Sequence, residues 1–398
     1  MYNLSRFFMQ KLLFTNISIL LLAFSLQTQA QTTVTKTMIS GGISREYRVY
    51  IPAVYLVSSG PVPVVFNFHG YTSSNIQQEF YGDFRPIADT ANFILVHPQG
   101  TMIGGSTGWN NFGALGTSPD DIGFVSDMID SLAANYNINK NRIYATGLSN
   151  GGFMSYDLAC LLSNKITAIA SVAGSQVPIH ASSCNAIHPT PIMQIHGDID
   201  AVVSYTGVGG IISCLHIDTL IKNWVTFNNC NTTPSLTSLP DINTTDNSTV
   251  QHFVYTGGTN GSSVELYKII GGGHTWPGSP FPVPSNGNTN LDFSASKEIW
   301  RFFSQYSLNN LATSLENPLK QNYQIAIYPN PATNQLTCSL NNMAEATVYF
   351  YTLYGSMIGQ YKLTNTMNTI DVTNFTKGIY TIKIITSKNI SFQHILIQ

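Results

Sequence analysis

Apolar and polar segments alternate in a regular order between residues 44 and 304. Near-continuous apolar runs such as "VPVVFNFHG" (62–70) are typical of buried central strands. The intervening segments carry apolar residues at helical spacing, as in 121–136. Further strands are expected at 46–52, 93–100, 142–147, 166–174, 190–197 and 265–273, and further helices at 150–163 and 294–306. This order predicts an α/β domain over residues 31–306, with a mostly parallel sheet covered by helices on both faces.

The pattern changes after residue 306. Residues 307–324 are polar and irregular, which predicts a linker. From 325 to 398 only strand signals remain, separated by turn residues, as in "QLTCSL" (335–340) and "SFQHILIQ" (391–398). The last segment is therefore predicted to form a small all-β sandwich domain.

The first 30 residues have the features of a signal peptide. Arg6 and Lys11 form a basic region, and the apolar run at 17–24 is too short to span a bilayer. Small and polar residues follow, so cleavage is expected after Ala30. The alternative is a membrane anchor. No later stretch is long and apolar enough to predict a membrane span.

Charge and cysteine content narrow the class of protein. Charged residues make up 10% of the chain, against roughly 25% in typical globular proteins, and the net charge is −2. This composition argues against a nucleic-acid partner. Export places the five cysteines in an oxidising compartment.

The cysteine positions allow one disulfide within the α/β domain. Cys160 lies near the end of the predicted helix at 150–163 and Cys184 lies in the loop before the next strand, which predicts a Cys160–Cys184 disulfide. Cys214 and Cys230 flank a predicted helix whose ends lie roughly 20 Å apart, too far for a disulfide unless the segment bends. Cys338 is predicted to be unpaired.

The segment "GLSNGG" (147–152) lies between a predicted strand and a predicted helix. A G-x-S-x-G motif in this context indicates a nucleophile elbow, in which Ser149 occupies a strained turn and glycines avoid collisions with neighbouring backbone. The alternative is an ordinary strand-to-helix turn. The strand-to-helix context favours Ser149 as a nucleophile, and a serine nucleophile needs a base to accept its proton.

An acid and a histidine follow the serine in the order that accompanies a nucleophile elbow. "HGDIDAVV" places Asp198 and Asp200 after a buried strand, and "GGGHTWPG" places His274 after a later one. We expect Asp200 to orient His274, with Asp198 as the alternative acid. The amides of Asn150 and Tyr71 are the expected oxyanion donors.

The motifs "FNFHGY", "GWN", "GLSNGGFMSYDLAC", "HGDIDAVVSY" and "GGGHTWPG" together resemble the secreted polyhydroxybutyrate depolymerase and feruloyl esterase-like proteins. The resemblance covers nearly all of residues 40–305. It implies an α/β-hydrolase fold and ester hydrolysis without a cofactor or metal, with Ser149, Asp200 and His274 at the nucleophile, acid and base positions. It also implies an aromatic role for Trp276, which with Tyr71 is expected to line the substrate site. "VHPQG" departs from the family pattern at His97.

The segments "YPNPATNQL" and "GIYTIKI" resemble the C-terminal sorting domain of type IX secretion. This resemblance implies a partner, the secretion machinery, and an extracellular or cell-surface location. The alternatives are a carbohydrate-binding module and a simple spacer.

The predicted function is that of a secreted serine esterase acting on feruloyl or acetyl esters of plant polysaccharide. Alternatives are a depolymerase of poly(3-hydroxybutyrate) or its oligomers, a peptidase, and an inactive hydrolase fold that serves as a binding module. No HExxH motif or comparable cluster predicts a metal enzyme.

Overall fold

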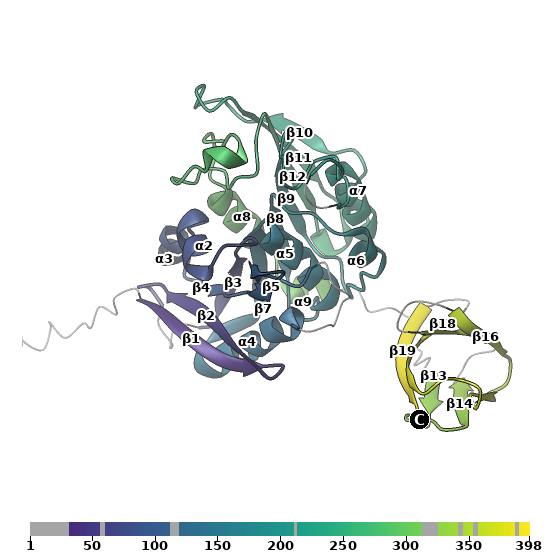
Figure 1. Ribbon diagram of the computed structural model, residues 1–398. Coiled ribbons are helices and arrows are strands. Elements are labelled where there is room, and N and C mark those ends of the chain that lie inside the picture. Colours follow the sequence, from purple (N-terminus) through teal and green to yellow (C-terminus); the bar gives the residue numbers. More distant parts are fainter. Residues whose placement is uncertain are drawn as a thin grey trace, which may run out of the picture. The chain divides into compact units, whose positions relative to one another are not determined.

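The computed structural model describes residues 32–55, 60–111, 119–210, 213–312, 325–340, 345–352, 357–386 and 390–398. The chain forms two compact units, Met1–Ser314 and Leu315–Gln398 (Figure 1). The predicted signal peptide and residues 313–324 of the predicted linker lie outside the described residues. None of the helices in the described ranges is long and apolar enough to cross a membrane.

The first unit is built on one sheet with the strand order β1-β2-β4-β3-β7-β8-β9-β12-β11-β10. Its strands are β1 (Thr32–Ser40), β2 (Ile43–Ile51), β3 (Val62–Phe68), β4 (Ile94–Pro98), β7 (Ile138–Leu148), β8 (Ala168–Val172), β9 (Ile192–Gly197), β10 (Ser235–Ser238), β11 (Thr249–Tyr255) and β12 (Val264–Ile270). The run from β4 through β12 is parallel, and the strands at both edges are antiparallel. The predicted mostly parallel sheet is therefore confirmed.

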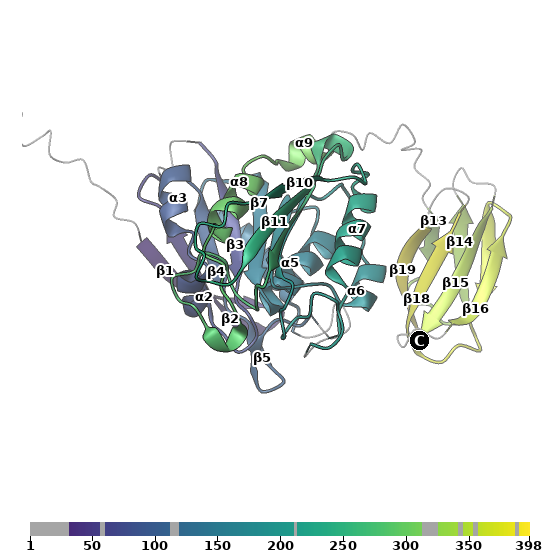
Figure 2. The same ribbon diagram turned by 90° about the horizontal axis from the view of Figure 1, so that it is seen from above.

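Helices cover both faces of this sheet (Figures 1 and 2). They are α2 (Asn75–Tyr81), α3 (Arg85–Ala91), α4 (Asp121–Asn135), α5 (Asn150–Leu161), α6 (Pro178–Ser182), α7 (Ile217–Phe227), α8 (Ala295–Phe303) and α9 (Leu308–Ala312). The loops of this unit also contain short 3₁₀ turns at Thr259–Gly261 and Pro284–Asn286 and a hairpin of β5 (Thr101–Ile103) and β6 (Ser106–Gly108). One core lies under α4, α5 and α7, and the other under α3, α8 and α9. Successive residues of a strand alternate between these cores, since Val64 and Phe66 face one and Val65 faces the other.

The start of the predicted linker is corrected by α9. The polar pattern places residues 308–312 in the irregular linker, but they form a helical turn. Leu308 and Leu311 stand three residues apart and so lie on one side of that turn, where both are buried. The first unit therefore continues beyond the predicted boundary at residue 306.

The second unit consists of two antiparallel sheets, β13-β14-β17 and β16-β15-β18-β19. Their strands are β13 (Ile325–Tyr328), β14 (Gln335–Leu340), β15 (Ala346–Thr352), β16 (Met357–Leu363), β17 (Met367–Asp371), β18 (Gly378–Ile385) and β19 (Ile390–Ile397). Alternate residues of both sheets, among them Leu336, Val348 and Ile382, form one buried core. This arrangement confirms the predicted all-β sandwich.

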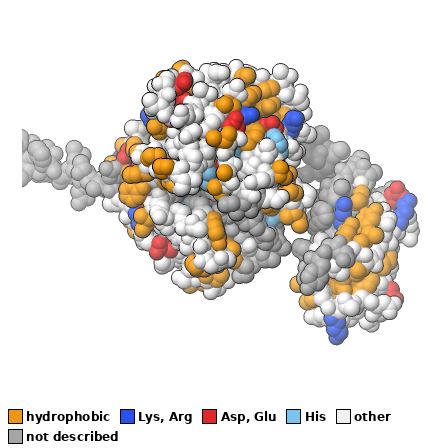
Figure 3. Space-filling model, turned by 45° about the horizontal axis from the view of Figure 1, so that its top comes forward, with side chains coloured by type: hydrophobic (Ala, Val, Ile, Leu, Met, Phe, Trp, Pro, Cys, Tyr) orange, Lys and Arg blue, Asp and Glu red, His pale blue; other side chains and the backbone are white. Residues whose placement is uncertain are grey.

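Uncharged atoms dominate the face of the molecule drawn in Figure 3, where charged side chains are sparse and scattered. This view agrees with the low charged fraction of 10%.

Candidate active site

Ser149 lies at the junction between β7 and α5 in a strained backbone conformation, with φ 55° and ψ −120°. Its amide donates to the carbonyl of Val172 at 2.8 Å, which ties the turn to the neighbouring strand. A Cβ atom at Gly147 would lie 2.6 Å from the carbonyl oxygen of Phe68, and one at Gly151 would collide with the same oxygen. The glycines are therefore required because the backbone of β3 passes directly beside the turn.

His274 and Asp200 are brought together from loops after β12 and β9. His274 Nδ1 lies 2.7 Å from Asp200 Oδ2, and both side chains are buried. Asp200 Oδ1 accepts from the amides of Val202 (2.8 Å) and Val203 (2.9 Å). An ionised carboxylate only accepts, so Nδ1 of His274 carries a proton and Nε2 is left free to accept one.

Two further side chains hold the acid loop in place. His196 Nε2 donates to the carbonyl of Val203 at 2.8 Å, and burial lowers the pKa of His196, which keeps its ring neutral. Asp198 Oδ1 accepts from the amide of Gly271 at 2.7 Å, which joins the end of β9 to the end of β12. The structure thus gives Asp198 a contact with a backbone amide and gives Asp200 the contact with His274.

The two expected oxyanion donors come from the loop after β3 and from the first residue of α5. The backbone amides of Tyr71 and Asn150 have no hydrogen-bond partner within the described part of the chain. His69 shapes the loop before Tyr71. Burial lowers its pKa to about 4, its Nε2 accepts from the amide of Gly100 (2.9 Å), and its Nδ1 therefore donates to the carbonyl of Gly70 (2.7 Å).

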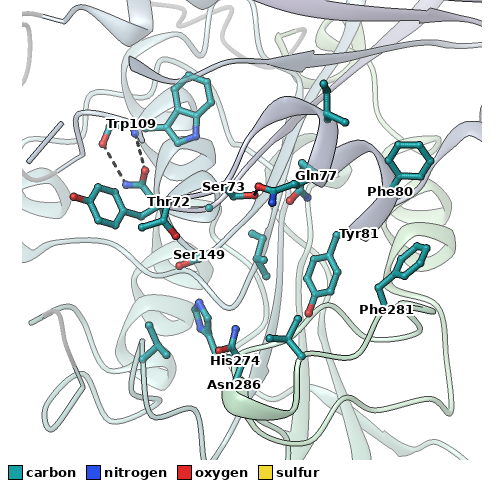
Figure 4. A pocket seen from close by; sticks show the side chains of 18 of the residues that line it. Thr72, Ser73, Gln77, Phe80, Tyr81, Trp109, Ser149, His274, Phe281 and Asn286 are labelled. Carbon is teal, nitrogen blue, oxygen red and sulfur yellow. Dashed lines mark hydrogen bonds between the residues drawn. The ribbon is translucent and has the colours of Figure 1, made fainter. Parts of the chain in front are cut away.

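Ser149 and His274 open onto one cleft with a volume of about 1080 Å³. Figure 4 shows the two side chains next to each other and Phe80, Tyr81 and Phe281 further along the cleft. One wall is α2 and the other is the loop 281–286. Among the residues that the structure describes, the lining of the cleft includes neither Asp, Glu, Lys nor Arg.

Comparison with known proteins relates each of the two units to a known family. Residues 118–229 match the family model described as phospholipase/carboxylesterase, and these residues include β7, Ser149 and Asp200. The first unit has the α/β-hydrolase fold. Residues 326–398 match the secretion system C-terminal sorting domain, which confirms the predicted sorting domain and with it export to the cell surface or the extracellular space.

The hydrolase unit is similar to several curated esterases. The chain is 31% identical over 171 residues to a bifunctional acetylxylan esterase/xylanase of Neocallimastix patriciarum and 29% identical over 220 residues to feruloyl esterase B of Piromyces equi. It is 24% identical over 242 residues to poly(3-hydroxyalkanoate) depolymerase C of Paucimonas lemoignei. These matches cover 43%, 53% and 55% of this chain, and 24%, 39% and 56% of the three relatives.

The role predicted for Trp276 is wrong. Its side chain is 1% exposed and does not line the cleft of the hydrolase unit. The indole packs edge-on against Phe84 and its Nε1 donates to Ser296 at 3.2 Å. Trp276 is therefore a core residue beneath the histidine loop. Tyr71, by contrast, lines the cleft, with 43% of its surface exposed.

The aromatic residues that form the cleft walls were not predicted from the sequence. Phe80 and Tyr81 lie on α2, a helix that the apolar pattern did not predict. The sequence does carry a signal for this helix, because Ser74 and Gln77 have the spacing of a capping box and Ser74 Oγ accepts from the Gln77 amide at 3.2 Å. Phe281 lies in a loop, where no periodic pattern could identify it.

The cysteines follow the predicted pairing. Cys160 and Cys184 form a disulfide with Cα atoms 4.6 Å apart, while Cys214, Cys230 and Cys338 are free and buried. Within the described ranges no group of three or more His, Cys, Asp or Glu side chains is arranged to hold a metal ion.

Proposed function

We propose that the protein is a secreted serine carboxylic ester hydrolase in which Ser149 is the nucleophile. The observation that carries the proposal is the short His274–Asp200 contact beside a serine on a strained turn, in one uncharged cleft. The related esterases support the same chemistry. The sorting domain supports export through the type IX machinery.

The reaction would proceed in two halves. Ser149 Oγ attacks the ester carbonyl while His274 Nε2 takes its proton, and Asp200 stabilises the resulting imidazolium. The amides of Asn150 and Tyr71 stabilise the oxyanion of the tetrahedral intermediate. His274 then gives the proton to the leaving alcohol, and a water molecule hydrolyses the acyl-enzyme by the same steps.

A nucleophile exchange tests this proposal. Ser149→Ala should lower kcat for p-nitrophenyl acetate by about 10⁴- to 10⁶-fold without changing Tm. Ser155→Ala is the matched control, because Ser155 is also on α5 but its hydroxyl donates only to the backbone carbonyl of Gly151. If Ser149→Ala retained a tenth of the activity, the assignment would be wrong. If the wild type hydrolysed no ester, the unit would instead be an inactive binding module.

For the substrate, we propose feruloyl or acetyl esters of plant polysaccharide. Phe80 and Phe281 stand on opposite walls of the cleft, 45% and 54% exposed. The Arg85 guanidinium lies over the Phe80 ring, 4.5 Å from its centroid, so we expect a planar acyl group to stack mainly on Phe281. Offset stacking on such a ring contributes about 0.5–1.5 kcal/mol beyond burial. The acetylxylan esterase and feruloyl esterase relatives support this substrate class.

Removal of one aromatic wall tests the acyl preference. Phe281→Ala should lower kcat/KM about 2- to 10-fold more for methyl ferulate than for p-nitrophenyl acetate, whose acetyl group is too small to stack. Phe227→Ala is the control, since Phe227 is 44% exposed and does not line the cleft. Equal effects of Phe281→Ala on both esters would contradict an aromatic acyl site.

The second candidate is a polyester depolymerase. Ile76 on the same wall is 49% exposed, so the mouth of the cleft presents aliphatic as well as aromatic surface, and one relative is a depolymerase. A panel of methyl ferulate, acetylated xylan and hydroxybutyrate films separates the two functions. Clearing of the films without release of ferulate or acetate would favour the depolymerase.

A further inference from the structure

The side-chain carboxamide of Asn150 forms two hydrogen bonds with the backbone of Trp109, a residue 41 positions earlier in the chain. This pair of hydrogen bonds is called the clasp below. Asn150 Oδ1 accepts from the Trp109 amide at 2.6 Å, and Asn150 Nδ2 donates to the Trp109 carbonyl at 3.2 Å (Figure 4, dashed lines). Nδ2 also donates to Asn111 Oδ1 at 2.6 Å. The carboxamide is buried and two of its three contacts are short, so it holds the loop 109–111 against the start of α5.

Trp109 extends this clasp to the loop that carries the other oxyanion amide. Its indole Nε1 donates to the carbonyl of His69 at 2.8 Å, and its ring packs edge-on against Phe68 with centroids 5.1 Å apart. Tyr71 follows His69 by two residues. The path from Asn150 through Trp109 to His69 therefore connects the two segments whose amides are expected to hold the oxyanion.

A second contact anchors the loop 109–111 on the nucleophile helix. Asn111 Nδ2 donates to Asp157 Oδ2 at 2.8 Å, and Asp157 Oδ1 lies 2.9 Å from His180 Nδ1. Asp157 stands seven residues after Asn150, so the two side chains project from the same face of α5. Asn111 is held between them and is itself 1% exposed. The loop is thus attached to α5 at two points.

The contacts made by Asn150 and Trp109 add to the close packing of Gly70 and Gly151 against neighbouring backbone, in a region where strand pairing has ended. The last paired residues of β3 and β7 are Phe68 and Gly147. The loop 69–72 and the turn at 149–150 both lie beyond this pair, where the sheet no longer fixes their separation. A misplacement of about 1 Å between such groups can cost on the order of 10²-fold in rate.

We propose that the Asn150 side chain is a positioning residue that, by clasping Trp109, sets the separation of the two oxyanion amides. This inference rests on the proposed esterase function. The backbone amide of Asn150 is retained in any side-chain variant, so a variant tests positioning and not the loss of a donor.

The test compares Asn150→Ala with a matched control elsewhere in the fold. Asn228 is 0% exposed, and its carboxamide accepts from the Thr190 amide (2.8 Å) and donates to the Thr190 carbonyl (2.7 Å), which is the same clasp far from the cleft. Asn150→Ala should lower kcat for p-nitrophenyl acetate on the order of 10²-fold, with little change in KM. It should weaken inhibition by an alkyl boronic acid, whose tetrahedral adduct occupies the oxyanion site, by a similar factor. Asn228→Ala should lower Tm but change neither kcat nor boronic acid inhibition.

A milder variant keeps the inference testable if Asn150→Ala does not fold. Trp109→Phe keeps an aromatic ring against Phe68 but removes the indole donor to His69 and part of the ring's packing. It should shift kcat and boronic acid inhibition together, as for Asn150→Ala. The inference is overturned if these folded variants resemble Asn228→Ala, or if KM rises while kcat is unchanged. Failure of the proposed function is distinguishable, because the wild type would then show no hydrolysis that depends on Ser149.

Discussion

Exchange of Asp200 for asparagine should disable the enzyme through the histidine and leave the fold intact. The carboxylate accepts three hydrogen bonds, from His274 Nδ1 on Oδ2 and from the amides of Val202 and Val203 on Oδ1. An asparagine that keeps its oxygen toward the two amides turns its NH₂ group toward Nδ1. Nδ1 must then accept, so the proton moves to Nε2 and His274 can no longer take the proton of Ser149.

The size of the expected decrease in kcat follows from the alternative orientation of the introduced amide. If the asparagine of Asp200→Asn turned its oxygen toward His274, the amides of Val202 and Val203 would both lose their acceptor. Each buried unsatisfied donor costs about 1–3 kcal/mol, or about 2–6 kcal/mol for the pair. At about 1.36 kcal/mol for each factor of ten, the productive orientation is disfavoured about 30-fold to 10⁴-fold. We expect kcat of the Asp200→Asn variant to decrease by a factor within that range.

Asp198→Asn is the matched control. Its amide oxygen can still accept from Gly271, and the residue is half-buried at the turn. kcat for p-nitrophenyl acetate and Tm should be measured for both variants. A loss in Asp198→Asn as large as that in Asp200→Asn would refute the reasoning, and the reverse order would move the acid role to Asp198.

Three further predictions concern stability and domain independence. Both ring nitrogens of His97 are buried without a partner among the described residues, and burial lowers its pKa to about 3. Stability is therefore lost as pH falls from 6.5 toward 3. His97→Leu should recover about 2.5 kcal/mol of unfolding free energy at pH 4.5 relative to pH 7 in urea titrations. Equal pH slopes in variant and wild type would contradict this. Cys160→Ala with Cys184→Ala opens a loop with a separation of 24 residues and should cost roughly 3 kcal/mol in the same titration, whereas an unchanged midpoint would mean that the crosslink does not stabilise the fold. A chain ending at Ser314 should keep the kcat of the full chain for p-nitrophenyl acetate, because the two units have separate cores; loss of activity with an unchanged Tm would show that the sandwich contributes to the site.

The central strands and the serine turn could be predicted because their signals are local. Strands such as β3 and β4 are buried on both faces and therefore read as continuous apolar runs. The edge strand β1 and the exposed strand β16 were missed, since most of their residues are polar or solvent-exposed and local hydrophobicity gives little contrast there.

The cleft could be predicted only in part, because its shape depends on contacts between distant segments. Trp276 is two residues from His274, yet sequence proximity does not determine whether a side chain enters the cleft or the core. Its indole is placed by Phe84 and Ser296, which belong to other segments. The clasp of Asn150 on Trp109 is equally non-local, so no motif around either residue could indicate it.

The proposed triad residues and the walls of the cleft come from different segments, and this separation has an evolutionary consequence. Ser149, Asp200 and His274 follow the ends of β7, β9 and β12, whereas the walls of the cleft come from α2 and the loop 281–286. Point mutations or short insertions in the two wall segments can change which acyl group fits while the strand ends stay as they are. Under the proposed function, related chains with this architecture can therefore differ in the ester that they hydrolyse while the residues after the strand ends stay the same.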